Sequence, residues 1–521
     1  MAVLTPLASD RAGEVTHDRP PSPSMLRSGL SSVALSALGL LLGFVSVPVL
    51  VAGLGYTGYG VYSLAFTIAG YGAFLDLGLG WAGMKFAADA HARRDRNTVA
   101  SVLWALALYQ LLIGGVVAVG LWAGAARVGG WLLASGGDEA ARVAEILPTA
   151  GLWFALSSLA GVLVGILRGV DRAGTAALAA GCALVIGVGG AALAVGHGYG
   201  LPAAAGCQVL GALVALLVAA AALRAFLLPV PGGRLVAASA DQLRRMLGFS
   251  LWSLLGRLVQ VAVLQGNKVI AARVAGAAGL AAYVVPFNLA QRLNALGAAA
   301  VTAVYPVAAG RAGTPDEFRA SYLRAARVVH LLTAAPALTL IALAPLFLHS
   351  WIGPEMAATA SGFLRVLGLG YWIVSVSSVE AGCLEGWGHP RLTALAGAGS
   401  VGVAALVAAL LLPAAGGLWA VAGGVAAWMT ATGLATTIAW QRVCRIPTAR
   451  LWRELLQPIV EMAGIALVAA ALVGGWVEPG PAGLLACVAL GALLLVYGFL
   501  RLFRAAERRM LLTRMTGLAG P

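Results

Sequence analysis

The sequence predicts an all-α protein that crosses a membrane many times. Of its 521 residues, 60% are hydrophobic and only 10% are charged, and the mean hydropathy is +0.91. Soluble domains carry about 25% charged residues, so this chain cannot cover its apolar surface with a polar shell. Apolar runs as long as a membrane-spanning helix, about 20 residues, recur along the whole chain. These runs are continuous and do not alternate as barrel strands do, which excludes a β-barrel.

These runs predict about fourteen transmembrane helices, arranged as two six-helix halves followed by two further helices. The predicted spans are 30–54, 60–83, 101–124, 146–167, 175–196, 201–223, 246–266, 279–309, 326–349, 358–384, 392–412, 416–439, 456–475 and 482–503. The expected divisions of the chain are a disordered cytoplasmic tail at 1–26, a first half at 27–223, a linker at 224–245, a second half at 246–440 and a final segment at 441–521. The tail has no apolar core, so it is not a signal peptide.

A short motif occurs twice and indicates that the two halves are repeats. GYTGYGVY at 55–62 and GAAGLAAY at 276–283 share the pattern G-x-x-G-x-x-x-Y, each between two predicted spans. A second pattern, G-x-L-x-G, begins at Gly165 and again at Gly382 and closes spans 4 and 10. The glycines allow tight turns, and tyrosine is common at the membrane surface. Because the matched positions lie six spans apart, we expect a parallel repeat of two halves with the same orientation.

The positive charges are distributed asymmetrically across the predicted membrane. The external segments hold four basic residues and the spans hold three, and all other Lys and Arg lie in segments on the side of the two termini. The external four are Arg127, Arg142, Lys268 and Arg273, and the three in spans are Arg257, Arg292 and Arg365. Such a bias places both termini in the cytoplasm. The net charge of +14 is thus explained by topology, and no nucleic-acid partner is expected.

Polar residues inside spans 7 and 8 predict a cationic cavity. Arg257 lies on a polar stripe of span 7, and Arg292 lies on a polar stripe of span 8. Ionisable residues at bilayer depth are costly and are therefore candidates for function. A guanidinium matches phosphate or carboxylate with two parallel hydrogen bonds, so we expect an anionic substrate group. The residues predicted to line the cavity are Arg257, Gln260, Lys268, Asn288, Gln291 and Arg292.

Two acidic residues are candidates for gating or coupling, and they also supply a structural alternative. Asp76 lies low in span 2, and Glu380 lies near the end of span 10. Either could instead form a structural ion pair with Arg257 or Arg292. Arg365 is a weaker candidate for the cavity, because it lies near enough to the outer face for its charge to reach the surface.

The motif content favours a transporter over an enzyme. The sequence contains no H-E-x-x-H, no P-loop and no C-x-x-C, so no metal or cofactor is expected. A membrane enzyme acting on lipid-linked sugars would need catalytic residues in an external loop. The longest predicted loop, at about 125–145, offers only Asp138, Glu139 and Arg142.

The stretch PVLVAGLGYTGYGVYSLAFTIAGYGAFLDLGLG at 48–80 resembles the N-terminal signature of polysaccharide-biosynthesis exporters. These belong to the multidrug/oligosaccharidyl-lipid/polysaccharide exporter superfamily. The resemblance implies a flippase in the bacterial inner membrane that moves undecaprenyl-diphosphate-linked oligosaccharide, such as an O-antigen or exopolysaccharide unit, and it implies possible cooperation with polysaccharide-assembly proteins. Asp76 matches the acidic position of the signature, whereas Gly297 occupies the equivalent position of the second half.

Two other functions of the same superfamily compete with this interpretation. A drug/cation antiporter would need acidic residues facing the cavity, whereas the central charges here are arginines. A lipid II flippase is less favoured, because no pattern typical of that branch is found. Knowing whether neighbouring genes encode glycosyltransferases would separate these alternatives best.

Overall fold

The computed structural model describes residues 23–75, 79–133, 137–227, 251–309, 315–386, 389–444, 448–473, 476–503 and 507–508. All regular elements in these ranges are helices. Twelve of the helical segments are long and apolar enough to cross a membrane. The predicted class, an all-α protein with many membrane passes, is confirmed.

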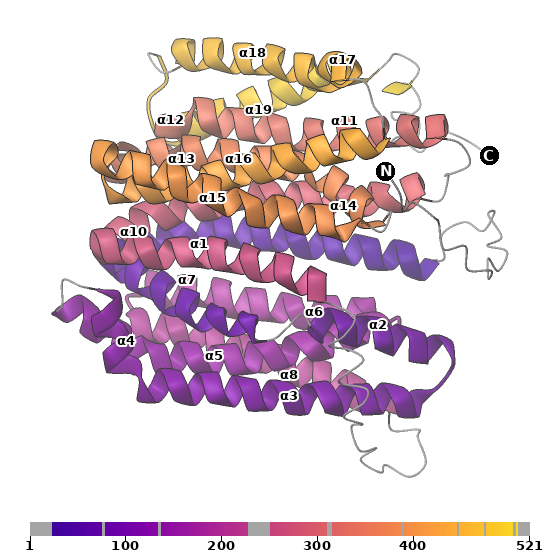
Figure 1. The fold of residues 1–521 in the computed structure, drawn as a ribbon. Helices are drawn as coiled ribbons and strands as arrows, with labels where there is room; N and C mark the ends of the chain where they lie inside the picture. The colour runs from indigo at the N-terminus through magenta and orange to yellow at the C-terminus, as the bar shows by residue number, and fades with distance from the viewer. Residues whose placement is uncertain are drawn as a thin grey trace.

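The first half of the chain forms one group of helices, drawn from indigo to magenta in Figure 1. Its elements are α1 (Pro23–Gly70), η1 (Tyr71–Phe74), α2 (Leu79–Ala92), α3 (Arg96–Ala123), α4 (Ala125–Leu132), α5 (Asp138–Gly169), α6 (Ala173–Ala183), η2 (Leu184–Gly189), α7 (Gly190–Gly196) and α8 (Leu201–Leu227).

The second half forms a second group, and α1 and α10 lie side by side between the two (Figure 1). Its elements are α10 (Leu251–Ala309), α11 (Pro315–Ala342), α12 (Ala344–Trp351), α13 (Pro354–Val376), α14 (Ser378–Gly386), α15 (Pro390–Ala415) and α16 (Gly417–Cys444). The chain then continues through α17 (Thr448–Leu451), η3 (Trp452–Leu456), α18 (Gln457–Val473) and α19 (Pro481–Leu502).

The last two long helices, α18 and α19, pack on the outside of the second half against α11 and α12 (Figure 1). Arg327 of α11 is almost fully buried and forms ion pairs with Glu454 of η3 and, at 2.9 Å, with Glu507. A buried arginine needs such partners. These ion pairs attach the C-terminal segment to the second half.

Two of the twelve long helices contain a reversal of the chain at a glycine. Gly55 in α1 has φ 70° and ψ 171°, and Gly276 in α10 has φ 69° and ψ −172°. Only glycine adopts this region readily. Beyond Gly276 the chain doubles back. The reversal is evident from a contact across the turn: the Lys268 ammonium lies 4.9 Å from the centroid of the Phe287 ring. Spans 1 and 2, and spans 7 and 8, are joined at these glycines without a loop, so each pair is counted as one of the twelve long helical segments. The exact count of fourteen spans stays a prediction.

One face of the bundle is built from glycine turns. Seven glycines have positive φ among the described residues, and each lies where one long helical pass ends and the next begins. Because successive passes run in opposite directions, the seven turns lie on the same face. They are Gly55, Gly137, Gly198, Gly276, Gly353, Gly416 and Gly480. We call this end the distal face, and we call the opposite end, where α1 begins and α19 ends, the terminal face. The repeated motif of the sequence thus supplies two of seven equivalent turns.

Substituting Gly55 or Gly276 with Ala should destabilise the protein, because a side chain in this backbone conformation costs about 1–3 kcal/mol. Gly115→Ala is the matched control, since Gly115 is helical and a Cβ there meets no atom within 4 Å. We expect a lower thermal unfolding temperature in detergent for the first two variants and an unchanged unfolding temperature for the control. Equal unfolding temperatures in all variants would show that the two turns are not strained.

The repeat extends one helical turn beyond the motif that the sequence analysis used. Tyr62 is followed by Phe66, and Tyr283 by Phe287, with ring centroids 4.9 Å and 5.7 Å apart respectively. Both tyrosines are buried inside the protein. The sequence analysis expected them at the membrane surface. The Tyr62 hydroxyl accepts a 2.7 Å hydrogen bond from the Gln208 amide.

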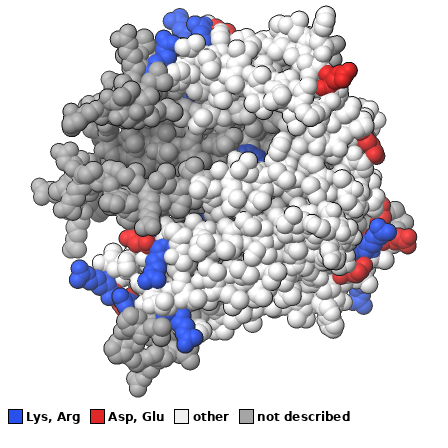
Figure 2. All heavy atoms as spheres, turned by 180° about the vertical axis from the view of Figure 1, so that it is seen from behind, with Lys and Arg blue, Asp and Glu red and all other residues white. Residues whose placement is uncertain are grey.

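The surface is consistent with a bilayer around the bundle. In the view of Figure 2 the charged side chains gather toward the two ends, and the middle is uncharged apart from one recessed blue group. Leu108, Leu112, Leu410 and Leu467 are among many large apolar residues with most of their surface exposed. Lipid covers such surfaces in a membrane protein.

Some predicted boundaries differ from the structure. Span 2 is not one continuous helix, because η1 interrupts it after Gly70, and residues 76–78 lie outside the described residues. The predicted loop at 125–145 is largely helical, in α4 and the start of α5. Of the predicted tail at 1–26, residues 1–22 lie outside the described residues and 23–26 begin α1. Of the predicted linker, 224–227 end α8 and 228–245 lie outside the described residues. The division into domains stays a prediction.

The orientation in the membrane can be tested with reporter fusions. Arg94 lies in the turn between α2 and α3 on the terminal face, and Gly137 precedes α5 on the distal face. If the positive-inside rule holds, a reporter fused after Arg94 should be cytoplasmic and one fused after Gly137 external. The reverse pattern would invert the predicted topology.

Candidate substrate site between the two halves

Arg292 reaches from the second half of the chain to the first. It lies on α10, sixteen residues beyond Gly276, which is roughly 24 Å along the helix and thus toward the terminal face. Its Nη1 donates a 2.8 Å hydrogen bond to the carbonyl oxygen of Gly39 in α1. A Cβ at Gly43 would overlap the guanidinium. The guanidinium therefore lies directly on the α1 backbone, where Gly43 leaves room for it.

A pocket of about 300 Å³ surrounds this guanidinium. It lies between α1 on one side and α10, α11 and α12 on the other. Its lining residues are Leu40, Leu41, Gly43, Phe44, Val47, Val285, Asn288, Leu289, Arg292, Leu293, Leu340 and Trp351. The lining is apolar except for Asn288, Arg292 and the indole N–H. Leu41 is 65% exposed, so the rim of the pocket is continuous with the lipid-facing surface.

Two further contacts cross between the halves at this pocket. The Trp351 indole stacks on Phe44, with ring centroids 5.1 Å apart, and its Nε1 donates a 2.9 Å hydrogen bond to the Phe44 carbonyl oxygen. The side chain of Asn288 lies beside that of Tyr59 of α1, which is buried. The polar groups of the pocket are thereby held in fixed positions.

Arg292 has no carboxylate partner among the described residues. No acidic residue lines the pocket. Glu380 is buried elsewhere, where its Oε1 accepts a 2.7 Å hydrogen bond from the Tyr322 hydroxyl. The alternative of a structural ion pair between Arg292 and Glu380 is therefore wrong. Asp76, the other proposed partner, lies outside the described residues.

The other predicted cavity residues are not gathered at this pocket. Lys268 is buried against Phe287 and lies in the part of α10 that precedes the turn at Gly276. The sequence analysis placed Lys268 in an external segment, and the structure shows that it lies within a helix instead. Gln260 and Gln291 are exposed and do not line the pocket. The backbone of Arg257 is helical, but its side chain lies outside the described part of the structure. Of the six predicted residues, Asn288 and Arg292 come together.

Close contacts seal the two halves against each other at the distal face. Gly60 of α1 packs so tightly on α10 that a Cβ there would overlap the Ala277 carbonyl oxygen. The Ala277 N–H donates a 3.2 Å hydrogen bond to Oε2 of Glu139 on α5. The Arg273 guanidinium lies 4.6 Å from the Trp131 ring centroid. Beneath these contacts one continuous apolar core joins residues of α1, α4 and α5 to residues of α10, α13 and α16.

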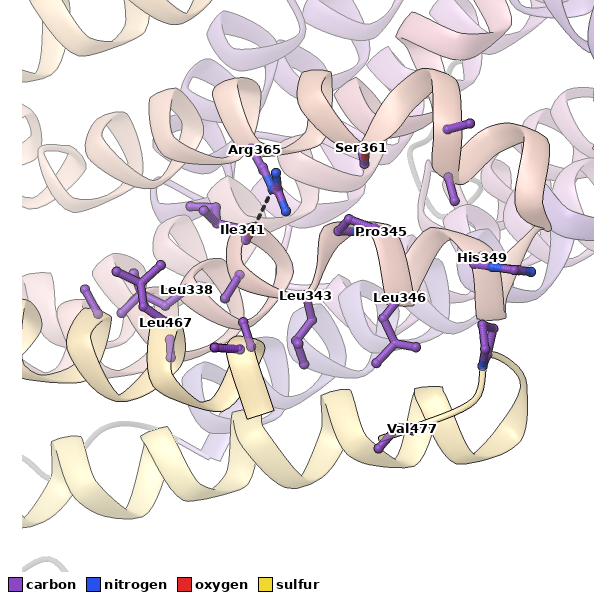
Figure 3. Close-up of a pocket in the computed structure, with 18 residues that line it drawn as sticks. Leu338, Ile341, Leu343, Pro345, Leu346, His349, Ser361, Arg365, Leu467 and Val477 are labelled. Atoms are coloured by element: carbon purple, nitrogen blue, oxygen red, sulfur yellow. Dashed lines mark hydrogen bonds between the residues drawn. The ribbon is translucent and has the colours of Figure 1, made fainter. Parts of the chain in front are cut away.

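A larger cavity, of about 1110 Å³, does not lie between the halves. It lies between α11, α12 and α13 on one side and α18 with the following loop on the other (Figure 3). Arg365 projects from α13 into it, and its Nε donates a 3.3 Å hydrogen bond to the Ile341 carbonyl oxygen (Figure 3). Arg365 is therefore separate from the Arg292 pocket, in agreement with its lower rank in the sequence analysis.

Three parts of the Arg292 pocket were missed from the sequence. Gly39 and Gly43 form a G-x-x-x-G pair in span 1. This spacing favours the close approach of another helix in membranes, so it could have indicated that span 1 packs against a second helix here. Trp351 and Tyr59 carried no signal, since their role depends on which helices meet.

The comparisons with known proteins agree on the fold. The family described as "Polysaccharide biosynthesis protein" matches residues 25–310. No curated protein matches the sequence. Among solved structures, the lipid II flippase MurJ in an inward closed conformation has a TM-score of 0.61 at 12% identity, covering 91% of this chain and 98% of that one.

Two other similar structures are transporters. A multidrug resistance MATE family transporter of the MOP superfamily, in an inward-facing conformation, has a TM-score of 0.59 at 18% identity and covers 80% of this chain and 98% of that one. A MOP superfamily transporter from Pyrococcus furiosus, described as having a binding pocket of reverse polarity, has a TM-score of 0.59 at 16% identity and covers 82% and 99%. At these identities the similarity shows a shared fold. The family match spans more than half of the sequence, and the chain therefore belongs to the polysaccharide biosynthesis protein family.

Proposed function

We propose that this protein is a flippase that moves an undecaprenyl-diphosphate-linked oligosaccharide, such as an O-antigen or exopolysaccharide repeat unit, across the bacterial inner membrane. The family match and the transporter fold support export of polysaccharide precursors. One observation carries the choice of substrate. The Arg292 guanidinium, without a carboxylate partner in the described residues, lies in a pocket between the halves that has no other charged lining residue and borders the lipid-facing surface.

The pocket suits both parts of such a substrate. Arg292 offers the donors for a diphosphate oxygen, and charge-assisted hydrogen bonds are the strongest that side chains form. Leu41 and Phe44, which are exposed beside it, offer an apolar surface for the isoprenoid chain in the bilayer. Asn288 adds a neutral hydrogen-bonding group.

Transport proceeds by alternating access around this pocket. In the described conformation the distal face is sealed by the Gly60–Ala277 contact and the Glu139 hydrogen bond, so the substrate enters from the terminal face. Release on the distal side requires these contacts to separate. The glycine turns at Gly55 and Gly276 lie at the distal face, in α1 and α10, the two helices that must separate.

The main rival is a drug/cation antiporter of the same superfamily. It would require a carboxylate in the pocket between the halves to hold a cation, whereas the charged group there is a guanidinium. A lipid II flippase remains a second alternative with the same anionic chemistry. It differs in the glycan and peptide attached to the lipid.

A binding experiment with purified protein tests the proposal. Undecaprenyl diphosphate and the lipophilic cation tetraphenylphosphonium should be titrated separately into the detergent-solubilised full chain. We expect the diphosphate to bind and Arg292→Ala to weaken its binding roughly tenfold or more, since a hydrogen bond to a charged group is worth about 1.5–3 kcal/mol. Binding of the cation alone would contradict the proposal and favour the antiporter.

A further inference from the structure

A second pocket lies on the distal face and is built differently from the Arg292 pocket. Its volume is about 570 Å³. Its lining residues are Tyr56, Val274, Ala275, Ala278, Gly279, Ala282, Glu355, Thr359, Phe363, Ala415, Gly416, Gly417, Leu418 and Trp419. We call it the distal pocket. It has three aromatic rings, one carboxylate and the hydroxyls of Thr359 and Tyr56, and it contains no basic residue. Seven of its fourteen positions are Ala or Gly, which leaves the space between the rings open.

The aromatic side chains of the distal pocket are held in place. A Cβ at Gly362 would stand 2.6 Å from Cη2 of Trp419, so the indole packs directly against this glycine. Phe363 supports the same indole, with ring centroids 4.8 Å apart. Trp419 nevertheless lines the pocket and is 37% exposed. The result is an aromatic platform that is held by its neighbours and still accessible.

The polar groups of the pocket stand beside this platform. The Tyr56 hydroxyl lies beside the backbone of Met356, next to Glu355. Glu355 is exposed in the first turn of α13, and the Thr359 hydroxyl donates a 2.8 Å hydrogen bond to the Glu355 carbonyl oxygen. The carboxylate has no ion-pair partner among the described residues and can accept hydrogen bonds from a ligand.

The two pockets follow one face of the same helix. Ala278 lines the distal pocket, Val285 and Arg292 line the other, and the three are spaced by seven residues on α10. Residues seven apart lie within about 20° of each other around a helix. The fourteen residues from Ala278 to Arg292 correspond to roughly 21 Å along it. A ligand leaving the Arg292 pocket toward the distal face would therefore follow this face of α10 to the distal pocket.

We propose that the distal pocket binds a neutral saccharide unit of the transported glycan through stacking on Trp419 and hydrogen bonds to Glu355. Aromatic rings offer an apolar face to the C–H side of a sugar ring, and a carboxylate accepts hydrogen bonds from its hydroxyls. Pockets lined by aromatic and small apolar residues with a few placed polar groups are typical of small-molecule sites. This proposal rests on the proposed function and adds to it a site for the sugar.

A cation is the other ligand that aromatic rings and a carboxylate can hold. Cation–π attraction is weak at exposed sites, about 0.5–1 kcal/mol, and Glu355 is exposed, so water screens its charge. The exposed carboxylate contributes more as a hydrogen-bond acceptor than as a counter-ion. The geometry thus favours the sugar.

Saturation-transfer NMR on the purified full chain in detergent tests the distal pocket directly. The probes are the methyl glycosides of glucose, galactose, mannose and N-acetylglucosamine, which carry neither lipid nor phosphate. We expect transfer to at least one glycoside, and a roughly tenfold weaker affinity in Glu355→Gln, the size expected for a hydrogen bond to a charged group. Trp419→Ala and Gly362→Leu, which would displace the indole, should also lose the signal.

Matched variants make the result specific. Glu478→Gln removes another exposed carboxylate on the distal face, and Trp122→Ala removes an exposed indole on α3; both should bind the glycosides normally. Arg292→Ala should do the same, so this test is separate from the binding of undecaprenyl diphosphate. No transfer to any glycoside, equal transfer in Trp419→Ala, or binding of tetraphenylphosphonium in their place would overturn the proposal, and the Arg292 site would be unaffected.

Discussion

Arg292→Ala should reduce export of surface glycan by roughly 10- to 100-fold, the loss expected when a partly buried charged hydrogen-bond donor to a substrate diphosphate is removed. Arg292→Lys should also impair export, although less, because an ammonium cannot form the paired hydrogen bonds of a guanidinium. The measurement is surface glycan per unit of membrane-inserted protein in cells that lack the native copy. Protein level should stay close to normal, since the guanidinium has no carboxylate partner among the described residues that its removal would leave unpaired.

Arg365→Ala provides the matched control. Arg365 is also an arginine within a predicted span, but it lies in the cavity beside α18 and not between the halves. Export should remain near the wild-type level in this variant. Normal export in Arg292→Ala, or an equal loss in Arg365→Ala, would contradict a specific role for Arg292.

Gly60→Ala should have the second largest effect, because the added methyl group would overlap the backbone of α10 at Ala277. Overpacking of this kind costs about 1–3 kcal/mol, which changes the ratio of closed to open distal faces by roughly 5- to 150-fold. We expect slower export and a distal face that opens more often. Gly115→Ala, where a Cβ meets no neighbour, should behave as wild type.

A cysteine at Leu280 can report this opening. Leu280 is fully buried in the apolar core that joins the two halves below Ala277. In a background without the native cysteines, Leu280→Cys should react slowly with a membrane-impermeant maleimide and faster when Gly60→Ala is added. An unchanged rate of modification would show that Gly60 does not hold the distal face closed.

The sequence predicted the parts of the fold that depend on local patterns. Apolar runs locate the helices, and the repeated glycine motif locates Gly55 and Gly276, because only glycine accepts the backbone angles found there. The other five glycine turns could not be predicted from the motif, because their glycines lie in turns that do not contain it. The apolar run weakens near Lys268, which predicts that the helix ends there, whereas the helix continues to Gly276.

The candidate site was predicted only in part, for a physical reason. Asn288 and Arg292 stand out in the sequence because they are polar residues in an apolar span. Gly39 and Gly43 belong to the same site because α1 and α10 pack together, and that contact depends on the whole fold. Lys268, which the sequence analysis placed in the same cavity as Arg257, is instead buried against Phe287.

The central claim is that this chain moves a diphosphate-linked saccharide lipid past Arg292, and reconstitution tests it most directly. The purified protein would be placed in vesicles that contain undecaprenyl diphosphate carrying a fluorescent saccharide, and the fraction of label quenched by external dithionite would be followed over time. Wild-type protein and Arg365→Ala should render all of the label accessible, while Arg292→Ala should leave the inner-leaflet label protected. Equal protection in vesicles with and without the wild-type protein, or full access in Arg292→Ala, would contradict the account.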